Sequence, residues 1–264
     1  MTRALAAAQS IPVRGDVDAN IREHLRLADV AAVEKAQVVV FPELSLTGYE
    51  LDLADELSFS EHDARLQPLV RLAAAREIML VVGAPVRIES SLHIGAFIIS
   101  PTGVIDLYTK QHLGAFAPSD SPGGIVPVAE STVFHPGHRN PLVRMRDTAA
   151  AVAVCADVGG PAHARAAAER GAETYLASMF VIPSDLERDL TRLRTYAERH
   201  AMAVVFSNYG GPSGGLPSGG RSAIWSPKGD LLAQLEATGS GIVVATEGDA
   251  GWRGKPITLN SVES

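Results

Sequence analysis

A carboxylate, an amine and a thiol occur at three distant places in this sequence, each at the end of a segment with the pattern of a strand. Glu43 stands in VVVFPEL, Lys110 in DLYTKQH and Cys155 in AVAVCAD. A free thiol is mostly protonated at neutral pH, so it needs a base or a nearby cation to become an attacking thiolate. Glu43 and Lys110 could supply both, and the three residue types together indicate nucleophilic chemistry at Cys155.

Each of these residues also has an ordinary structural interpretation. Taken singly, Glu43 is a turn carboxylate, Lys110 a solvated ammonium and Cys155 a packed thiol. Cys155 is the single cysteine of the chain, so it is either a small core residue or a reactive group. The combination favours chemistry, because sites in open α/β sheets gather where strands give way to loops.

Apolar runs of strand length alternate with helical patterns along the chain, which predicts an α/β fold. The predicted strands cover residues 3–9, 38–41, 79–82, 95–100, 104–109, 149–154, 174–177, 203–207, 222–226, 231–236 and 241–246. The Gly-Ala-Pro at 83–85 is interpreted as the end of the third strand, and 241–246 as the last strand. Turns at 101–103 and 227–230 predict antiparallel hairpins, so the sheet is mixed.

Helices are predicted between these strands. One has four apolar residues on a single face, at positions 21, 25, 28 and 32, and the others cover residues 64–76, 161–170 and 185–200. Ser184 with Glu187 three residues later has the form of a capping box, which starts the last helix at Asp185. Residues 113–144 are interpreted as irregular. The glycine-rich segment 208–221 is interpreted as a loop that lacks the Gly-Lys-Ser/Thr end of a phosphate-binding loop.

Composition limits the classes of partner. The chain of 264 residues has 30 Asp and Glu against 23 Lys and Arg, and this acid excess works against nucleic-acid binding. A small molecule is the expected partner, and one domain over residues 1–264 is the expected organisation. No stretch approaches the roughly 20 apolar residues that span a bilayer, and the first residues, MTRALAAAQS, lack the apolar part of a signal peptide. Cytoplasmic residence follows as the default expectation.

Six segments carry a resemblance to a known family. They are ALAAAQ, VVVFPELSLTGYELD, YTKQHL, ESTVFHPG, AVAVCADV and GGRSAIWSPKGDLL. In these segments, and over nearly its whole length, the chain resembles the nitrilase superfamily of carbon-nitrogen hydrolases. The resemblance implies a four-layer α-β-β-α sandwich with two mixed sheets face to face, assembled as homodimers or larger homo-oligomers. It also implies a catalytic triad of Glu43, Lys110 and Cys155, assisted by a second glutamate that matches Glu130.

The implied reaction is hydrolysis of a non-peptide carbon-nitrogen bond through a thioester on Cys155. Lys110 and the backbone N–H of Ala156 are the expected oxyanion donors, and loss of one such donor commonly costs about 3 kcal/mol in barrier height. A small amide is the expected substrate. A carbamoyl or nitrile substrate, an acyltransferase with the same triad and a catalytically silent binding protein remain alternatives.

The surroundings of the triad complete the prediction. Tyr49, Ser178, Met179 and Phe180 are the expected pocket walls, and His112 is expected to orient the loop after Lys110. No cofactor is required by the chemistry. No metal is expected either, because the H-x-x-H pair at 135–138 lies in a loop without a cysteine or carboxylate cluster beside it.

One departure from the family pattern concerns the substrate. Many amide-cleaving relatives carry an arginine four residues after the cysteine, and this chain has Gly159 there. A guanidinium that could bind a substrate carboxylate is therefore missing at this position. This argues against a dicarboxylate monoamide as substrate unless Arg165 or Arg221 reaches the same space.

Overall fold

The computed structural model describes residues 3–121 and 123–259, whose strands form two mixed sheets. The strands of the larger sheet are β1 (Arg3–Gln9), β2 (Val38–Val40), β3 (Met79–Ile88), β4 (Ser91–Ile99), β5 (Ile105–Thr109), β12 (Ser240–Gly248) and β13 (Gly251–Leu259). Those of the smaller sheet are β6 (Leu142–Met145), β7 (Thr148–Val154), β8 (Thr174–Ser178), β9 (Ala203–Ser207), β10 (Ala223–Trp225) and β11 (Leu231–Gln234). The α-helices are α1 (Val17–Val33), α2 (Gln67–Arg76), α3 (Pro161–Glu169) and α4 (Pro183–His200).

The strand order explains why both sheets are mixed. The larger sheet runs β13-β12-β1-β2-β3-β4-β5 and the smaller runs β11-β10-β9-β8-β7-β6. In each sheet three central strands are parallel, β1-β2-β3 in one and β7-β8-β9 in the other, and the flanking pairs are antiparallel. The two predicted hairpins are present as β4-β5 and β10-β11.

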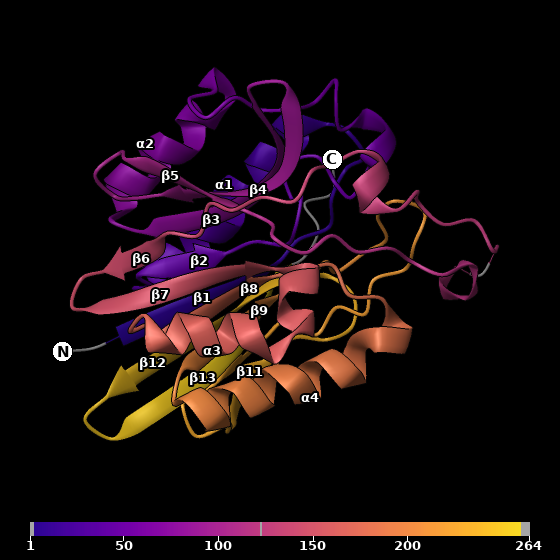
Figure 1. Ribbon diagram of the computed structural model, residues 1–264. Coiled ribbons are helices and arrows are strands. Elements are labelled where there is room, and N and C mark those ends of the chain that lie inside the picture. Colours follow the sequence, from indigo (N-terminus) through magenta and orange to yellow (C-terminus); the bar gives the residue numbers. More distant parts are fainter. Residues whose placement is uncertain (1–2, 122, 260–264) are drawn as a thin grey trace.

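Three apolar cores separate four layers in the described residues. One core lies between the two sheets, the second packs the larger sheet against α1 and α2, and the third packs the smaller sheet against α3 and α4. In β1, Leu5 belongs to the inter-sheet core, whereas Ala6 belongs to the core under α1, as the period of two in a strand requires. Figure 1 shows the two helix pairs on opposite sides of the strands. The predicted α-β-β-α sandwich is confirmed.

The structure corrects the interpretation of residues 83–85 as a strand end, because β3 continues to Ile88. The carbonyl of Pro85 accepts a hydrogen bond from the Phe59 N–H (2.8 Å), on the edge of β3 that faces away from β4. The two polar groups of one strand residue point to the same edge, so the missing N–H of Pro85 removes no bond from the β3-β4 ladder.

Two strands were not predicted from the sequence. β13 is an edge strand with mostly exposed side chains and includes Gly254 and Pro256, so no apolar alternation marks it. β6 lies at an edge of the smaller sheet and begins within the 113–144 segment that was expected to be irregular. Both strands depend on a partner strand for their hydrogen bonds, which is information that a local pattern lacks.

The start of α4 also differs from the prediction. The helix begins at Pro183, and its N-cap is Ile182 with no side-chain cap, so the Ser184–Glu187 capping box is wrong. Proline is favourable in the first turn because its missing N–H would have no partner there. No helix in the described part of the chain has the length and apolar content to cross a bilayer. The single domain over residues 1–264 stays a prediction, since it includes residues outside the described ranges.

Candidate active site

The carboxylate and the ammonium that were predicted to act together meet beyond the ends of their strands. Lys110 Nζ lies 2.7 Å from Glu43 Oε1, and both side chains are fully buried. The Cys155 thiol lies close enough for the charges of both groups to act on its pKa. The fold therefore brings Glu43 and Lys110, which are far apart in the sequence, into direct contact, and the charges of both act on the Cys155 thiol.

Glu43 is held in a tight turn after β2. The Ser45 N–H donates to the carbonyl of Pro42 (3.2 Å), and Leu44 has a φ of 52°. This turn packs directly on Gly83 of β3, where an added Cβ would lie 2.4 Å from the Leu44 nitrogen. A glycine is required at this position because any side chain would push the Glu43 turn away from the sheet.

Glu130 is the second carboxylate on Lys110. Its Oε1 accepts hydrogen bonds from Lys110 Nζ (2.7 Å) and the Tyr49 hydroxyl (2.6 Å), and its Oε2 accepts one from the Gly114 N–H (2.7 Å). The ammonium thus directs two of its three N–H donors at carboxylates. Within residues 3–121 and 123–259 the third donor has no partner, so it is available to an oxygen of a substrate.

Cys155 follows β7 in a strained conformation. Its φ of 41° lies in the left-handed region, which is unfavourable for a residue with a side chain and is often found at functional sites. The thiol donates to the carbonyl of Phe180 (3.5 Å), and the residue is partly exposed. Cys155 and Ala156 open a short 3₁₀ helix, Cys155–Gly159. The first N–H groups of a helix have no partner within it, so Ala156 can offer its N–H to an oxyanion.

Asp157 connects the Cys155 turn to the segment after Lys110. Its Oδ1 accepts from the backbone N–H groups of Gln111 (3.1 Å) and His112 (2.8 Å), and contacts His112 Nδ1 (3.0 Å). Its Oδ2 accepts from the hydroxyl of Tyr108 (2.7 Å). The carboxylate is fully buried. His112 thus contacts Asp157, a residue that the sequence reasoning missed, and its orienting role stays a prediction.

Burial is the largest single influence on the pKa of each reacting group, although for Lys110 the neighbouring charges together outweigh it. It raises the pKa of Glu43 to about 7, although the charge of Lys110 acts in the opposite direction. It also raises the pKa of the Cys155 thiol, and the Glu43 carboxylate adds to this effect. For Lys110, burial acts to lower the pKa, but the charges of Glu43 and Cys155 outweigh it and the pKa is raised. At neutral pH the thiol keeps its proton and Glu43 is near its midpoint, which suits a general base.

A cavity of about 210 Å³ lies beside the thiol. Cys155 lines it together with five residues that were predicted for the site: Tyr49, Glu130, Ala156, Met179 and Phe180. Ser178 was predicted as a wall and is not one, because its buried side chain points to the backbone and donates to the carbonyl of Phe41 (2.8 Å). The walls next to the thiol are therefore largely aromatic and apolar.

Two arginines that the sequence reasoning missed also line this cavity. Arg188 and Arg192 of α4 border it, together with Asp185 and Asp189. Asp and Arg residues three and four apart on a helix predict a solvated face, so no local signal separates these residues from surface pairs. The two arginines considered from the sequence lie elsewhere and form ion pairs, Arg165 with Glu169 and Arg221 with Glu187.

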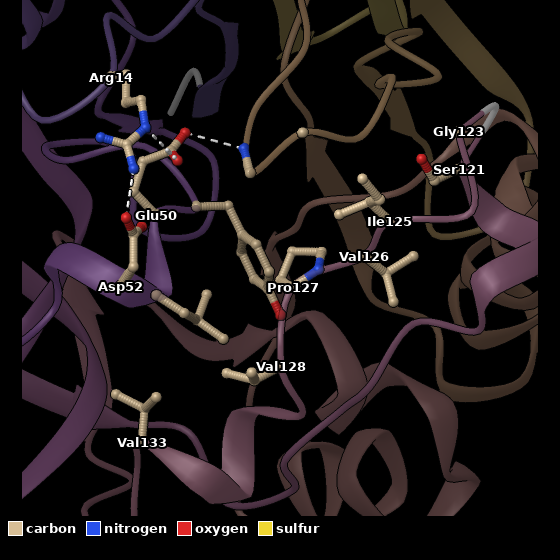
Figure 2. Close-up of a pocket in the computed structure, with 14 residues that line it drawn as sticks. Arg14, Glu50, Asp52, Ser121, Gly123, Ile125, Val126, Pro127, Val128 and Val133 are labelled. Carbon is tan, nitrogen blue, oxygen red and sulfur yellow. Dashed lines mark hydrogen bonds and ion pairs between the residues drawn. The ribbon is translucent and has the colours of Figure 1, made fainter.

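A second, larger cavity of about 830 Å³ shares Tyr49 with the first. Figure 2 shows Arg14 directed at Glu50 and Asp52, across from apolar residues that include Ile125 and Val128. The cavity has no thiol and its guanidinium is already paired with two carboxylates. Its size does not make it a reaction site, so the smaller cavity is the candidate. In the described part of the chain, no group of three or more His, Cys, Asp or Glu residues could hold a metal ion.

Comparison with known proteins identifies the family of this chain. The sequence profile of the family described as carbon-nitrogen hydrolase matches residues 4–247. The chain belongs to the carbon-nitrogen hydrolase family. This carbon-nitrogen hydrolase is 25% identical over 238 residues to the glutamine-dependent NAD(+) synthetase of Aquifex aeolicus (strain VF5), which covers 88% of this chain and 40% of that protein. It thus spans about two fifths of the length of that synthetase.

Two amidases are also similar to this carbon-nitrogen hydrolase. The (R)-stereoselective amidase of Pseudomonas sp is 25% identical over 221 residues, with 83% of this chain and 75% of the amidase covered. The amidase of Nesterenkonia sp. AN1 has been solved as a cysteine-to-alanine mutant in complex with butyramide. That structure superposes with a TM-score of 0.78 at 25% identity and covers 92% of this chain and 89% of its own. A glutamate-to-glutamine mutant, with the acetamide moiety of fluoroacetamide added covalently at the active site cysteine, gives a TM-score of 0.79 at 25% identity and covers 94% of this chain and 91% of its own.

Proposed function

We propose that this carbon-nitrogen hydrolase is an amidase that cleaves small-molecule amides through a thioester on Cys155. The observation that carries the proposal is the buried Lys110 ammonium, which contacts Glu43 and Glu130 beside a partly exposed thiol at the wall of a cavity. Burying one ammonium with two carboxylates is costly, and a catalytic role accounts for an arrangement that packing alone would not favour.

In the first half-reaction Glu43 accepts the thiol proton as Cys155 Sγ attacks the amide carbon. A carbon-sulfur bond forms, and the carbonyl oxygen takes the negative charge. The third N–H of Lys110 and the N–H of Ala156 stabilise this oxyanion. Glu43 then gives its proton to the nitrogen, the carbon-nitrogen bond breaks, and ammonia leaves the thioester behind.

In the second half-reaction a water molecule replaces the ammonia. Glu43 accepts a proton from this water as its oxygen attacks the thioester carbon, and the same two donors stabilise the second oxyanion. The carbon-sulfur bond breaks, the acid is released, and the thiolate recovers its proton from Glu43. Glu130 holds Lys110 and Tyr49 in place through the cycle and exchanges no proton in this scheme.

An amide is preferred as substrate because of the relatives. The Nesterenkonia amidase binds butyramide, and the Pseudomonas relative is named as an amidase. The cavity of about 210 Å³ in this chain has room for a short acyl group. Assembly as a homodimer or larger homo-oligomer and residence in the cytoplasm are further parts of the proposal, and sedimentation velocity would measure the assembly.

The test combines ammonia release with mass spectrometry of the intact protein. Wild-type protein given butyramide should release ammonia and, when quenched during turnover, carry a butyryl group on Cys155. Cys155→Ala should do neither. Turnover of butyronitrile and not butyramide would replace the amidase proposal by a nitrilase, and an adduct that turns over only with added hydroxylamine would replace it by an acyltransferase. A thiol that forms no adduct with either compound would contradict the proposal.

A further inference from the structure

The cavity at Cys155 has a charged side that the proposed mechanism does not use. Arg188 and Arg192 of α4 form this charged side of the cavity. Tyr49, Phe116 and Phe180 form its aromatic walls. The ammonia that leaves and the reacting amide are neutral, so neither needs a guanidinium. The arginines therefore face the part of a substrate that the reaction leaves unchanged, which is the acyl chain.

There is open space next to these arginines. Gly159 lines the same cavity, and a Cβ added to Gly159 would meet no atom within 4 Å. A side chain at this position would fill part of the cavity. Its absence leaves room for a substrate group between the Cys155 turn and the first turns of α4.

Both guanidinium groups retain unused donors. Arg188 contacts Asp185 Oδ1 through Nη1 (2.8 Å) and Asp189 Oδ1 through Nε (3.5 Å), and Arg192 contacts Asp189 through Nη1 alone. A guanidinium has five N–H donors in a fork that fits a carboxylate. Among the described residues the Nη2 groups of both arginines have no partner. The arginine side chains are 58% and 27% exposed, so a ligand can reach them.

The start of α4 adds a second source of positive potential. Val181 and Asp185 of this region line the cavity, and the first turn of the 18-residue helix has no side-chain cap. The helix dipole favours an anion at this end, although the Asp185 N–H already donates to the carbonyl of Ile182 (3.1 Å). Glu130, Asp185 and Asp189 also line the cavity, so its charged groups carry no net positive charge, and the arginines can serve a ligand with one carboxylate better than one with several.

We infer that Arg188 and Arg192 bind a carboxylate at the far end of the acyl chain, so that the preferred substrate is the monoamide of a short dicarboxylic acid. This inference rests on the proposed amidase function and specifies its substrate class. It also answers the sequence-based argument against such substrates, because two arginines of α4 stand at the cavity where Gly159 supplies none.

The experiment compares two amides of equal chain length, succinamate and butyramide, which differ in a carboxylate for a methyl group. Wild-type protein should have the higher kcat/KM for succinamate, with the advantage in KM and weakened by added salt. In Arg188→Gln the succinamate-to-butyramide ratio should fall about tenfold or more, because a charge-assisted hydrogen bond is lost. Asp189 keeps Arg192 as its partner in this variant, so the helix should stay folded.

Two further variants separate recognition from a structural role. Asp185→Asn removes the carboxylate that competes for Arg188, and the ratio should rise by about twofold to fivefold. Arg194→Gln removes an arginine of the same helix that is paired with Glu198 and does not line the cavity, and the ratio should stay at the wild-type value. A loss in Arg188→Gln without a gain in Asp185→Asn would indicate helix disruption and overturn the inference.

The outcomes distinguish the subsite from the reaction. Turnover of butyramide with no preference for succinamate would overturn the carboxylate subsite and leave the amidase proposal intact. Absence of turnover and of acyl adduct with both amides would contradict the two together. If Arg192→Lys, which keeps the charge and loses the fork, retained the full wild-type ratio, Arg192 would have no part in the subsite.

Discussion

At the scale of single residues, Lys110 is the group on which the site depends, because it is a fully buried ammonium that separates two buried carboxylates. Glu43 and Glu130 both accept from it at 2.7 Å. Removing one partner of a buried ion pair leaves an uncompensated charge, which commonly costs about 3–5 kcal/mol. The same ammonium carries the free donor proposed for the oxyanion, so stability and catalysis share this residue.

Lys110→Met is therefore expected to lower kcat by about 100-fold to 1000-fold with a small change in KM, because the lost donor acts mainly in the transition state. Steady-state kinetics with butyramide would measure kcat and KM, and a thermal melt would measure the loss of stability. Lys228→Met, at an exposed position of the β10-β11 turn, is the matched control and should change neither. Unchanged turnover with weaker substrate binding in Lys110→Met would contradict the role given to Lys110.

The raised pKa of Glu43 predicts how activity depends on pH. Glu43 must be ionised to accept the thiol proton, and its pKa is raised to about 7. Activity should therefore be lost as pH falls, with kcat/KM rising about tenfold per pH unit below this value and levelling above it. The Cys155 pKa is raised as well, so the thiol keeps its proton across this range.

A pH profile of kcat/KM for butyramide would check this expectation. The residual activity of Glu43→Gln should lack the acidic limb, because glutamine does not titrate. A profile in wild-type protein that is flat from about pH 5 to pH 8 would contradict a general base at Glu43. An acidic limb that persists in Glu43→Gln would assign the titration to another group.

At the scale of elements, the sequence predicts buried strands well and edge strands poorly. β1, β7 and β9 lie within continuous apolar runs and were predicted to within a residue at each end. β13 was missed because its exposed side chains carry no apolar pattern, and its stability comes from pairing with β12. The strand end predicted at residues 83–85 was wrong because the polar groups of Pro85 face the edge of β3 that points away from β4. The missing N–H of Pro85 therefore breaks no hydrogen bond between β3 and β4.

The residues of the candidate site also divide into some that the sequence could predict and some that it could not. Glu43, Lys110 and Cys155 were predictable because each lies at the end of a predicted strand and because the family resemblance singles them out. Arg188 and Arg192 were not, because charged residues at helical spacing have the pattern of a solvated face whether or not a cavity lies beside them. Asp157 was not, because its function depends on distant hydrogen-bond donors that only the folded chain supplies.

The contacts of Asp157 make it a positioning residue between two elements. Its carboxylate links the 3₁₀ helix that begins at Cys155 to the loop after Lys110. Asp157→Asn would turn an N–H₂ group toward backbone donors and displace one element from the other, and small displacements of this kind cost up to about 100-fold in rate. We expect kcat to fall by about tenfold to 100-fold with KM little changed.

A variant at the far end of the same network provides the control. The hydroxyl of Tyr175 contacts His163 Nδ1 (2.8 Å), and His163 in turn contacts Tyr108, but Tyr175 does not touch the Lys110 loop. Tyr175→Phe should lower the melting temperature and leave kcat within about threefold of wild type. For each variant the loss of kcat can be compared with the loss of melting temperature. If this ratio were the same in Asp157→Asn as in Tyr175→Phe, Asp157 would have only a structural role.

At the scale of the whole molecule, the site lies where the two sheets meet. Glu43 and Lys110 follow strands of the larger sheet, and Cys155 follows a strand of the smaller one. Their contact therefore requires both sheets to be packed face to face through the inter-sheet core. A chain in which one sheet was lost would lose the site entirely, so activity reports on the intact sandwich.

The shared core also predicts that the two sheets unfold together. The chain has 2 tryptophans, and each belongs to one sheet: Trp225 lies in β10 of the smaller sheet and Trp252 in β13 of the larger. In Trp225→Phe and in Trp252→Phe the remaining indole reports on a single sheet. The denaturant midpoint from fluorescence should equal the midpoint from far-UV circular dichroism within each variant, because unfolding one sheet exposes the apolar face of the other. A fluorescence midpoint that precedes the circular dichroism midpoint in the Trp225→Phe variant alone would show that β13 frays separately, and early transitions in both variants would contradict a single cooperative core.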